Sequence, residues 1–320
     1  MTVCVAAIAE MGGDRLILGA SDRMVTAGDI EFEQEQKKIH ILTTSIAIMV
    51  AGDLCVIGDI LHEVNAWRDQ QIADFPTDWL KVKNTADRFN EALLKAKREA
   101  AKNAILVPLA LDYADLTSGA VSTELAMQLS KEVYEYQFPV IEALVTGIDP
   151  SGAHIYSVDG VKGVCCQDWL GFAAIGYGAP HASSQLMFAG HVKNRNFAET
   201  LMLLYSSKRR AEVAPGVGEE TDMFAIGPGI GNVIDVGEPL MTELEKTYQA
   251  SKKQAEKVRT AANAKITRFF QVPTGATPVQ SQSNRELETG SIGAQEGGTE
   301  ANGETAATQI EATPADARQP

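Results

Sequence analysis

Short hydrophobic runs dominate the first fifty residues of the chain. Residues 3–8 and 16–20 are two such runs, and the segment EMGGDR between them contains the Gly-Gly-Asp sequence of a tight turn, which predicts a β-hairpin. Residues 39–43 and 46–50 predict a second strand pair. Because these runs are almost continuously apolar, we expect sheets that are covered on both faces.

Longer segments with apolar positions three or four residues apart predict helices further along. Residues 54–70 form one, and residues 78–103 form another with Thr77 as its expected N-cap. Residues 105–137 have a less regular pattern, and we expect them to add a helix near residues 123–136.

The second half of the chain again places strands before helices. The segment VIEALVTGIDPSGAHIYSVD predicts two strands joined by the Asp-Pro-Ser-Gly turn at residues 149–152. The remaining expected elements are helices over residues 183–193 and 198–211, a strand over 222–226 and a long, mostly solvated helix over 239–270. This order of strands and helices is typical of an α+β protein.

The composition changes at residue 272. From there to residue 320 the chain is rich in Gly, Ser, Thr, Gln and Glu and has no aromatic residue. Such a segment buries too little apolar surface to offset its ordering entropy, so we expect a disordered acidic tail. We therefore divide the chain into a domain over residues 1–271, with an atypical insertion around 105–137, and a tail over 272–320.

The net charge and the hydropathy of the chain limit the classes of partner that it is expected to bind. The net charge of −14 argues against a nucleic-acid partner, because nucleic-acid binders usually present a basic surface. The sequence has no apolar run near the roughly 20 residues that span a bilayer and no signal-peptide pattern. We therefore expect a cytoplasmic protein without a membrane partner.

Cysteines and histidines give no sign of a metal. The four cysteines contain no CxxC pair, and a disulfide between the neighbours Cys165 and Cys166 would be strained, so we expect reduced and mostly buried thiols. The five histidines lack paired metal-ligand spacing. The sequence therefore predicts no metal and no cofactor.

Thr2 follows Met1, and a methionine before a small residue is usually removed. Thr2 would then carry a hydroxyl and a free α-amine, whose ordinary pKa of about 7.7 to 8.0 suits a base at neutral pH. Such a nucleophile needs a cation near the amine, a carboxylate that holds the cation and an N–H group for the oxyanion. The candidates for these roles, each at the end of an expected strand, are Lys38, Asp22 and Gly52.

At these positions the sequence resembles the proteasome β-subunit and HslV-like threonine peptidase family, which belongs to the N-terminal-nucleophile hydrolases. The family has a threonine before the first strand, an aspartate at the end of the second, a threonine four residues later, a lysine before a short apolar strand and a glycine after the next strand. The matching residues are Thr2, Asp22, Thr26, Lys38 and Gly52. Spacings of 16 residues from Asp22 to Lys38 and 14 from Lys38 to Gly52 fit the family. The resemblance covers most of residues 2–270 and is weakest across 105–137.

The resemblance implies an α+β fold: a four-layer αββα sandwich of two antiparallel sheets flanked by helices. It implies a threonine endopeptidase in which Thr2 attacks the scissile carbonyl and its own amine acts as base. Lys38, held by Asp22, would tune the amine, and the Gly52 N–H would bind the oxyanion. The residues expected to bind a peptide or unfolded protein substrate are Thr26, Val25, Gln36, His40, Val50 and Leu54.

The resemblance also implies a closed homo-oligomeric ring and leaves open an ATPase partner. The sequence departs from the family in three supporting positions. Tyr177 stands where the family has a serine, Glu212 replaces a supporting aspartate, and Pro215 replaces a second serine. The alternative interpretation is therefore a catalytically inactive subunit of the same fold with a structural or binding role.

Overall fold

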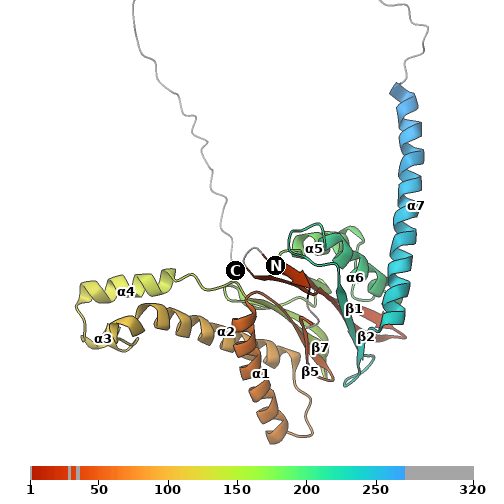
Figure 1. The fold of residues 1–320 in the computed structure, drawn as a ribbon. Coiled ribbons are helices and arrows are strands. Elements are labelled where there is room, and N and C mark those ends of the chain that lie inside the picture. The colour runs from red at the N-terminus through yellow and green to blue at the C-terminus, as the bar shows by residue number, and fades with distance from the viewer. Residues whose placement is uncertain (1, 28–29, 34–36, 271–320) are drawn as a thin grey trace, which may run out of the picture. The chain divides into compact units, whose positions relative to one another are not determined.

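The computed structural model describes residues 2–27, 30–33 and 37–270, which contain two large antiparallel sheets and seven α-helices (Figure 1). The first sheet has the strand order β10-β1-β2-β11-β12. Its strands are β1 (Cys4–Met11), β2 (Asp14–Asp22), β10 (Phe172–Ile175), β11 (Thr221–Ile226) and β12 (Val233–Asp235). This sheet thus combines the beginning of the chain with its second half.

The second sheet has the order β5-β6-β7-β8-β9, and a separate two-stranded hairpin joins β3 to β4. The strands of the second sheet are β5 (Ile39–Thr43), β6 (Ile46–Ala51), β7 (Glu142–Asp149), β8 (Gly152–Asp159) and β9 (Gly163–Cys166). The hairpin consists of β3 (Met24–Ala27) and β4 (Ile30–Glu33). The predicted turn at residues 149–152 is confirmed, because Asp149 pairs with Gly152 at the junction of β7 and β8.

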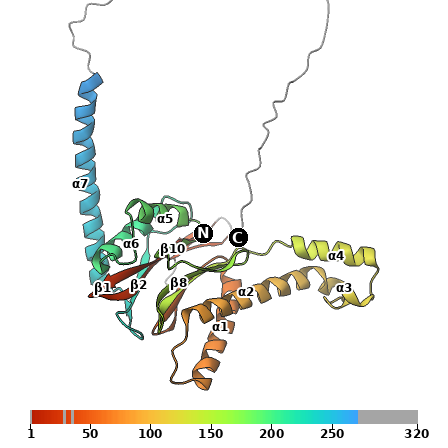
Figure 2. The same ribbon diagram turned by 180° about the vertical axis from the view of Figure 1, so that it is seen from behind.

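The helices are α1 (Leu54–Asp74), α2 (Val82–Ile105), α3 (Asp115–Ser118), α4 (Thr123–Glu135), α5 (Ala179–Phe188), α6 (Phe197–Ala211) and α7 (Glu238–Phe270). Figure 2 shows α5 and α6 beside the first sheet and α1 and α2 beside the second. No helix of the described residues is both long enough and apolar enough to cross a membrane.

Successive residues of β1 face two different hydrophobic clusters. Val5 packs with residues of α6 such as Leu204, whereas Ala6 packs with residues of the second sheet such as Met49. The second sheet alternates in the same way, since Ile48 of β6 packs with the cluster that includes helices α1 and α2. Both sheets are therefore covered on both faces, as the continuous apolar runs predicted.

Two predicted helix starts are wrong. α2 begins at Val82 rather than residue 78, and Thr77 is not its N-cap. The cap position is Lys81, whose side chain makes no capping bond, and the Val82 N–H is bound instead by Asp149 Oδ2 at 3.0 Å. A contact from the end of β7 thus replaces the local cap that the sequence pattern predicted. α5 spans Ala179–Phe188 rather than residues 183–193, with a proline in its first turn.

The expectation of mostly buried cysteines is also wrong. All four are free thiols, but only Cys4 among them is buried, while Cys55 and Cys166 are exposed. Cys55 lies in the first turn of α1, and Cys166 lies on β9, the outermost strand of its sheet. An edge strand and a helix start leave such side chains uncovered.

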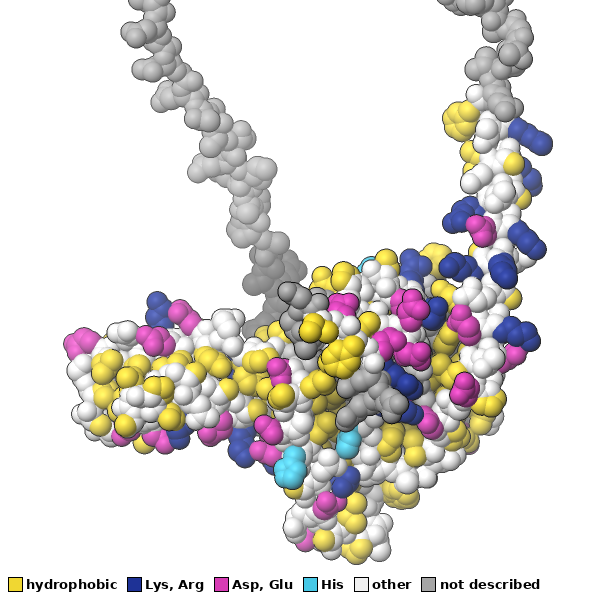
Figure 3. All heavy atoms as spheres, viewed as in Figure 1, with side chains coloured by type: hydrophobic (Ala, Val, Ile, Leu, Met, Phe, Trp, Pro, Cys, Tyr) yellow, Lys and Arg dark blue, Asp and Glu magenta, His cyan; other side chains and the backbone are white. Residues whose placement is uncertain are grey.

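The region around residues 105–137 forms a short 3-10 turn (Val107–Leu109), α3 and α4 beyond the end of α2 (Figures 1 and 2). The predicted helix near residues 123–136 is confirmed as α4. Figure 3 shows hydrophobic side chains gathered over this region. Exposed apolar residues here include Val107, Leu109, Met127 and Tyr134.

The end of the chain is a separate part of the structure. Among the described residues, those up to 262 belong to one compact unit, and residues 263–270 belong to a second. The predicted solvated helix is confirmed as α7, in which Leu244 is the buried residue and Lys and Arg side chains line the exposed length (Figure 3). The predicted acidic tail, residues 272–320, lies outside the described residues.

Candidate functional site

The three side chains of the predicted catalytic group meet at one point. Asp22 is the last residue of β2, and the antiparallel β1–β2 register, with Asp22 N–H bound to Val3 C=O at 3.2 Å, places it beside Thr2. The Thr2 hydroxyl donates a hydrogen bond to Asp22 Oδ1 and accepts one from Lys38 Nζ. Thr2 is almost completely buried.

The Asp22 carboxylate is held by donors on both oxygens. Oδ1 accepts the Val3 N–H at 2.9 Å, and Oδ2 accepts the N–H groups of Met24 at 3.0 Å and Gly218 at 3.1 Å. Lys38 Nζ lies 3.0 Å from each oxygen. Asp22 has no exposed surface, so these bonds replace the water that a carboxylate otherwise requires.

Lys38, the cation of the ion pair with Asp22, lies beside the second sheet. Lys38 immediately precedes β5, and its carbonyl accepts the N–H of Val50 on β6 at 3.3 Å. Its side chain is 6% exposed and that of Asp22 is 0% exposed, so the ion pair is shielded from water. The site therefore forms where an end of the first sheet meets an end of the second.

A pocket of about 570 Å³ opens over Thr2. Its walls come from β3, from the end of β6 with the start of α1, and from the turn after β10. The predicted site residues that line it are Thr2, Val25, Thr26, Lys38, Val50, Gly52, Leu54 and Tyr177. The remaining lining residues are Met24, Ala51, Asp53, Cys55, Val140, Glu142 and Gly176.

Two residues that were expected to line the pocket, His40 and Gln36, are not among its described lining residues. The His40 side chain lies toward α1, with Nε2 3.2 Å from Asn65 Oδ1, and His40 is not among the described residues that line the pocket. Gln36 lies outside the described residues. Its contact with Asn65 places the His40 side chain at α1 rather than at the Thr2 pocket.

Gly52 joins β6 to the cap of α1 and has a φ of +135°. A Cβ at this position would collide with the carbonyl oxygen of Val140. The following residue, Asp53, caps α1 by accepting the N–H groups of Cys55 at 2.9 Å and Val56 at 3.2 Å. Glycine is thus needed here for both its backbone conformation and its lack of a side chain.

The structure adds Glu142 to the site. This first residue of β7 lines the pocket, and its Oε2 accepts the Gly176 N–H at 2.9 Å. Its position at the start of a predicted strand is the sequence signal that would have identified it. The carboxylate fixes the turn that also presents Tyr177 to the pocket.

Two cysteines lie close to Thr2 but differ in reactivity. Cys4 is buried, with its Sγ 3.5 Å from the carbonyl oxygen of Val50, and burial raises the pKa of its thiol to about 12. Cys4 therefore stays protonated at neutral pH and is a poor nucleophile. Cys55 is exposed and lines the pocket, so it is accessible to an electrophile that enters.

The two predicted supporting residues occupy different places. Tyr177 is 60% exposed at the pocket. Glu212 directly follows α6 and does not line the pocket; its Oε1 accepts a hydrogen bond from Lys208 Nζ at 2.7 Å and lies 3.2 Å from Arg209 Nη1. Within the described residues, no group of three or more His, Cys, Asp or Glu side chains is arranged to hold a metal ion.

Comparison with models of known protein families and with curated protein sequences finds no match for this chain. The chemistry of the site is therefore inferred from its own atoms. A buried hydroxyl lies between an ammonium and a carboxylate, beneath a pocket of about 570 Å³.

Proposed function

We propose that this protein is a threonine peptidase whose nucleophile is Thr2 after removal of Met1. The observation that carries this proposal is the position of the Thr2 hydroxyl between Lys38 and Asp22 at the pocket. This hydroxyl contacts both members of a buried ion pair, and Thr2 lines the pocket, which is the arrangement expected of a nucleophile.

In the first step Thr2 Oγ attacks the scissile carbonyl carbon while the free α-amine of Thr2 takes the hydroxyl proton. The carbonyl π electrons move to oxygen, and the Gly52 N–H stabilises that oxyanion. The amine then donates its proton to the leaving nitrogen as the C–N bond breaks. An ester on Thr2 remains, and a water molecule activated by the same amine hydrolyses it.

Lys38 serves this chemistry through charge. A nearby ammonium disfavours a second positive charge, so it keeps the α-amine in the neutral form that accepts a proton. Asp22 compensates the charge of Lys38 at 3.0 Å and keeps the ammonium in place. The walls formed by Val25, Thr26 and Leu54 would bind the substrate, with the Thr26 backbone pairing with an extended peptide.

Three separate hydrophobic clusters support a four-layer αββα sandwich, the fold of the N-terminal-nucleophile hydrolases. One cluster joins α5 and α6 to the first sheet, one lies between residues of both sheets, and one joins α1 and α2 to the second sheet. In such a sandwich, the strand ends that carry the proposed catalytic residues of both sheets lie next to each other at Thr2.

The proposal includes a self-compartmentalising homo-oligomeric ring in the cytoplasm, since an accessible peptidase would threaten other proteins. The exposed apolar residues beyond α2, such as Val107 and Leu109, are suitable ring contacts. Light scattering at micromolar concentration tests this part. A monodisperse monomer near the chain mass of 34.3 kDa would contradict the ring but not the chemistry of Thr2.

Labelling with a hydroxyl-directed electrophile, such as a peptide β-lactone, tests the peptidase. Intact mass should show loss of one methionine, and peptide mapping should place the acyl group on Thr2. The exposed thiol of Cys55 lines the same pocket, so Cys55→Ala is the matched control and should label as the wild type does. Retained Met1 with no acyl group on Thr2 would support the inactive subunit instead.

A further inference from the structure

A lysine lies on the face of α6 that packs against the first sheet. The buried residues of α6 follow helical spacing, and Lys208 falls in this row between Leu204 and Ala211. Lys208 has no exposed surface. A lysine at such a position costs free energy unless each of its donors has a partner, so its presence calls for a physical explanation.

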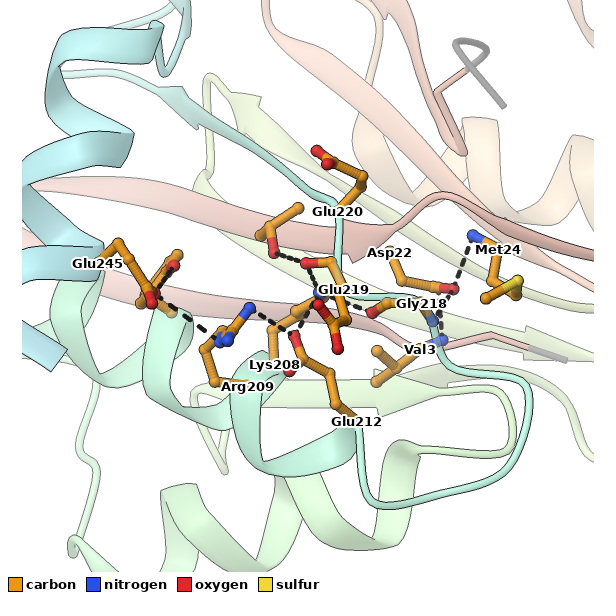
Figure 4. Close-up of polar contacts among 12 residues, drawn as sticks. Val3, Asp22, Met24, Lys208, Arg209, Glu212, Gly218, Glu219, Glu220 and Glu245 are labelled. Atoms are coloured by element: carbon orange, nitrogen blue, oxygen red, sulfur yellow. Dashed lines mark hydrogen bonds and ion pairs between the residues drawn. The ribbon is translucent and has the colours of Figure 1, made fainter. Parts of the chain in front are cut away.

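The Lys208 ammonium has three short contacts to acceptors. Nζ donates to Glu212 Oε1 at 2.7 Å, to the Gly218 carbonyl at 2.8 Å and to the Glu219 carbonyl at 2.6 Å (Figure 4). An ammonium has three N–H donors, so all of them are used. Two of these bonds fix the backbone of the loop between α6 and β11.

The same loop reaches the carboxylate of the candidate site. β11 pairs with β2, with Thr221 opposite Asp22, so the residues before β11 pass beside the end of β2. The Gly218 N–H points at Asp22 and is bound to its Oδ2 at 3.1 Å (Figure 4). Gly218 thus connects the two residues: its N–H binds the aspartate that holds Lys38, and its carbonyl oxygen binds the buried lysine.

We propose that Lys208 is a positioning residue of the Thr2 site: by binding the carbonyls of Gly218 and Glu219, it aims the Gly218 N–H at Asp22, and so fixes the carboxylate that orients Lys38 and the Thr2 hydroxyl. This inference rests on the proposed peptidase function. Lys208 does not line the pocket, so it acts on the reaction only through Asp22 and leaves substrate contacts unchanged.

The neighbouring Arg209 provides a contrast within the same network. Its Nη1 lies 3.2 Å from Glu212 Oε1, and its Nε lies 3.8 Å from Glu245 of α7. Figure 4 shows these contacts on the side of Glu212 that faces away from Asp22. Arg209→Met would therefore remove a charge from the same helix without removing a bond to the loop.

The test compares Lys208→Met, the double variant Lys208→Met with Glu212→Leu, and Arg209→Met. The single variant leaves Glu212 without its lysine and risks misfolding. The double variant removes both charges together, and such replacements of buried ion pairs by apolar side chains are often tolerated. Each variant is assayed for kcat and KM on a peptide substrate, for the rate of β-lactone labelling at Thr2, for melting temperature and for amide exchange across residues 217–220.

We expect the double variant to keep the wild-type KM and to exchange the Gly218 amide hydrogen faster. Its kcat and labelling rate should fall about 10- to 100-fold, which is the effect of removing one buried donor to a charged group. Arg209→Met should match the wild type in all of these. Wild-type kcat and exchange in a folded double variant would overturn the inference. A wild type with neither turnover nor label would instead overturn the proposed function, and amide exchange would still report whether Lys208 holds the loop.

Discussion

Two places in this molecule bring a hydroxyl, a cationic group and a carboxylate within hydrogen-bonding distance. At the first, Thr2 contacts Lys38 and Asp22. At the second, the turn between β7 and β8, Ser151 Oγ lies 2.9 Å from His154 Nε2, and His154 Nδ1 lies 2.6 Å from Asp168 Oδ2. By residue type the second cluster looks the more catalytic of the two, since it has the serine, histidine and aspartate of many hydrolases.

The positions of the protons in the second cluster show that His154 cannot act as a base for Ser151. Ser151 Oγ is also 2.5 Å from Asp149 Oδ1, which can only accept, so the hydroxyl proton belongs to that bond. His154 Nε2 must then donate to Ser151 Oγ while Nδ1 donates to Asp168, which makes the ring an imidazolium. The hydrogen bond to Asp168 raises the pKa of His154 and favours this form, although burial opposes it. A protonated histidine is not a base, and the group stabilises the turn.

The comparison shows that environment, and not residue type, separates a candidate reactive hydroxyl from a structural one. Ser151 is exposed in a four-residue turn, and its own N–H is bound to Asp149 at 2.8 Å. Thr2 is buried beneath a pocket, and its hydroxyl, which donates to Asp22 as that of Ser151 donates to Asp149, also accepts a hydrogen bond from a buried ammonium. Three pairs of matched variants distinguish the two places, and a fourth pair tests the second cluster alone.

The largest difference is expected between Thr2→Ala and Ser151→Ala. Removing the nucleophile should lower peptide hydrolysis at least about 10³-fold, as loss of a nucleophile does in other hydrolases, with folding intact. Ser151→Ala should leave turnover unchanged. Fluorogenic peptide assays on both variants measure this, and equal turnover in Thr2→Ala and wild type would refute the role of Thr2.

Asp22→Asn and Asp168→Asn should differ in stability. The first leaves Lys38 buried without its counter-charge and should cost about 3–5 kcal/mol of unfolding free energy. The second removes a partly exposed pair with His154 and should cost about 1 kcal/mol. Denaturant unfolding monitored by circular dichroism gives both values, and similar losses would show that the two pairs are equally important to the fold.

Gly52→Ala and Gly152→Ala separate steric conflict from backbone strain. The two glycines have φ values of +135° and +132°, so alanine is strained at both, by about 1–2 kcal/mol. A Cβ meets nothing within 4 Å at Gly152 but collides with Val140 at Gly52. Gly52→Ala should therefore cost a further 1–3 kcal/mol, roughly the penalty of overpacking, and should also lose hydrolysis. Equal melting temperatures would contradict the tight fit at Gly52.

The smallest effect is a pH dependence at the second cluster. Because the folded-state pKa of His154 is raised above the unfolded value of about 6.5, its contacts stabilise the fold fully below about pH 6.5, and this contribution is lost as the pH rises through the folded-state pKa. His154→Gln should therefore be most destabilising at acidic pH and least at alkaline pH. Unfolding of this variant and of His62→Gln, an exposed histidine of α1, measures the difference, and parallel curves for the two variants would contradict it.

Local patterns predicted most elements but not all boundaries. The apolar runs identified β1, β2, β5 and β6, and periodic spacing identified α1, α4, α6 and α7. The short strands β3, β4, β9, β10 and β12 were not predicted, because a strand of three or four residues carries too little alternation. The start of α2 was missed because its capping acceptor, Asp149, is 67 residues away in the chain.

For the candidate site, the sequence by itself determined which residues lie at the strand ends, namely Thr2, Asp22, Lys38 and Gly52. The number of residues between them is set by the lengths of the intervening strands and turns, and strand length is a local property of the chain. Only the tertiary structure decided that His40 faces α1, that Glu142 joins the pocket and that Lys208 supports Asp22 through Gly218. The bond from Gly218 to Asp22 spans 196 residues. Such contacts depend on how the sheets and helices pack, and no pattern within one segment encodes which distant backbone group will fill the last acceptor site of a buried carboxylate.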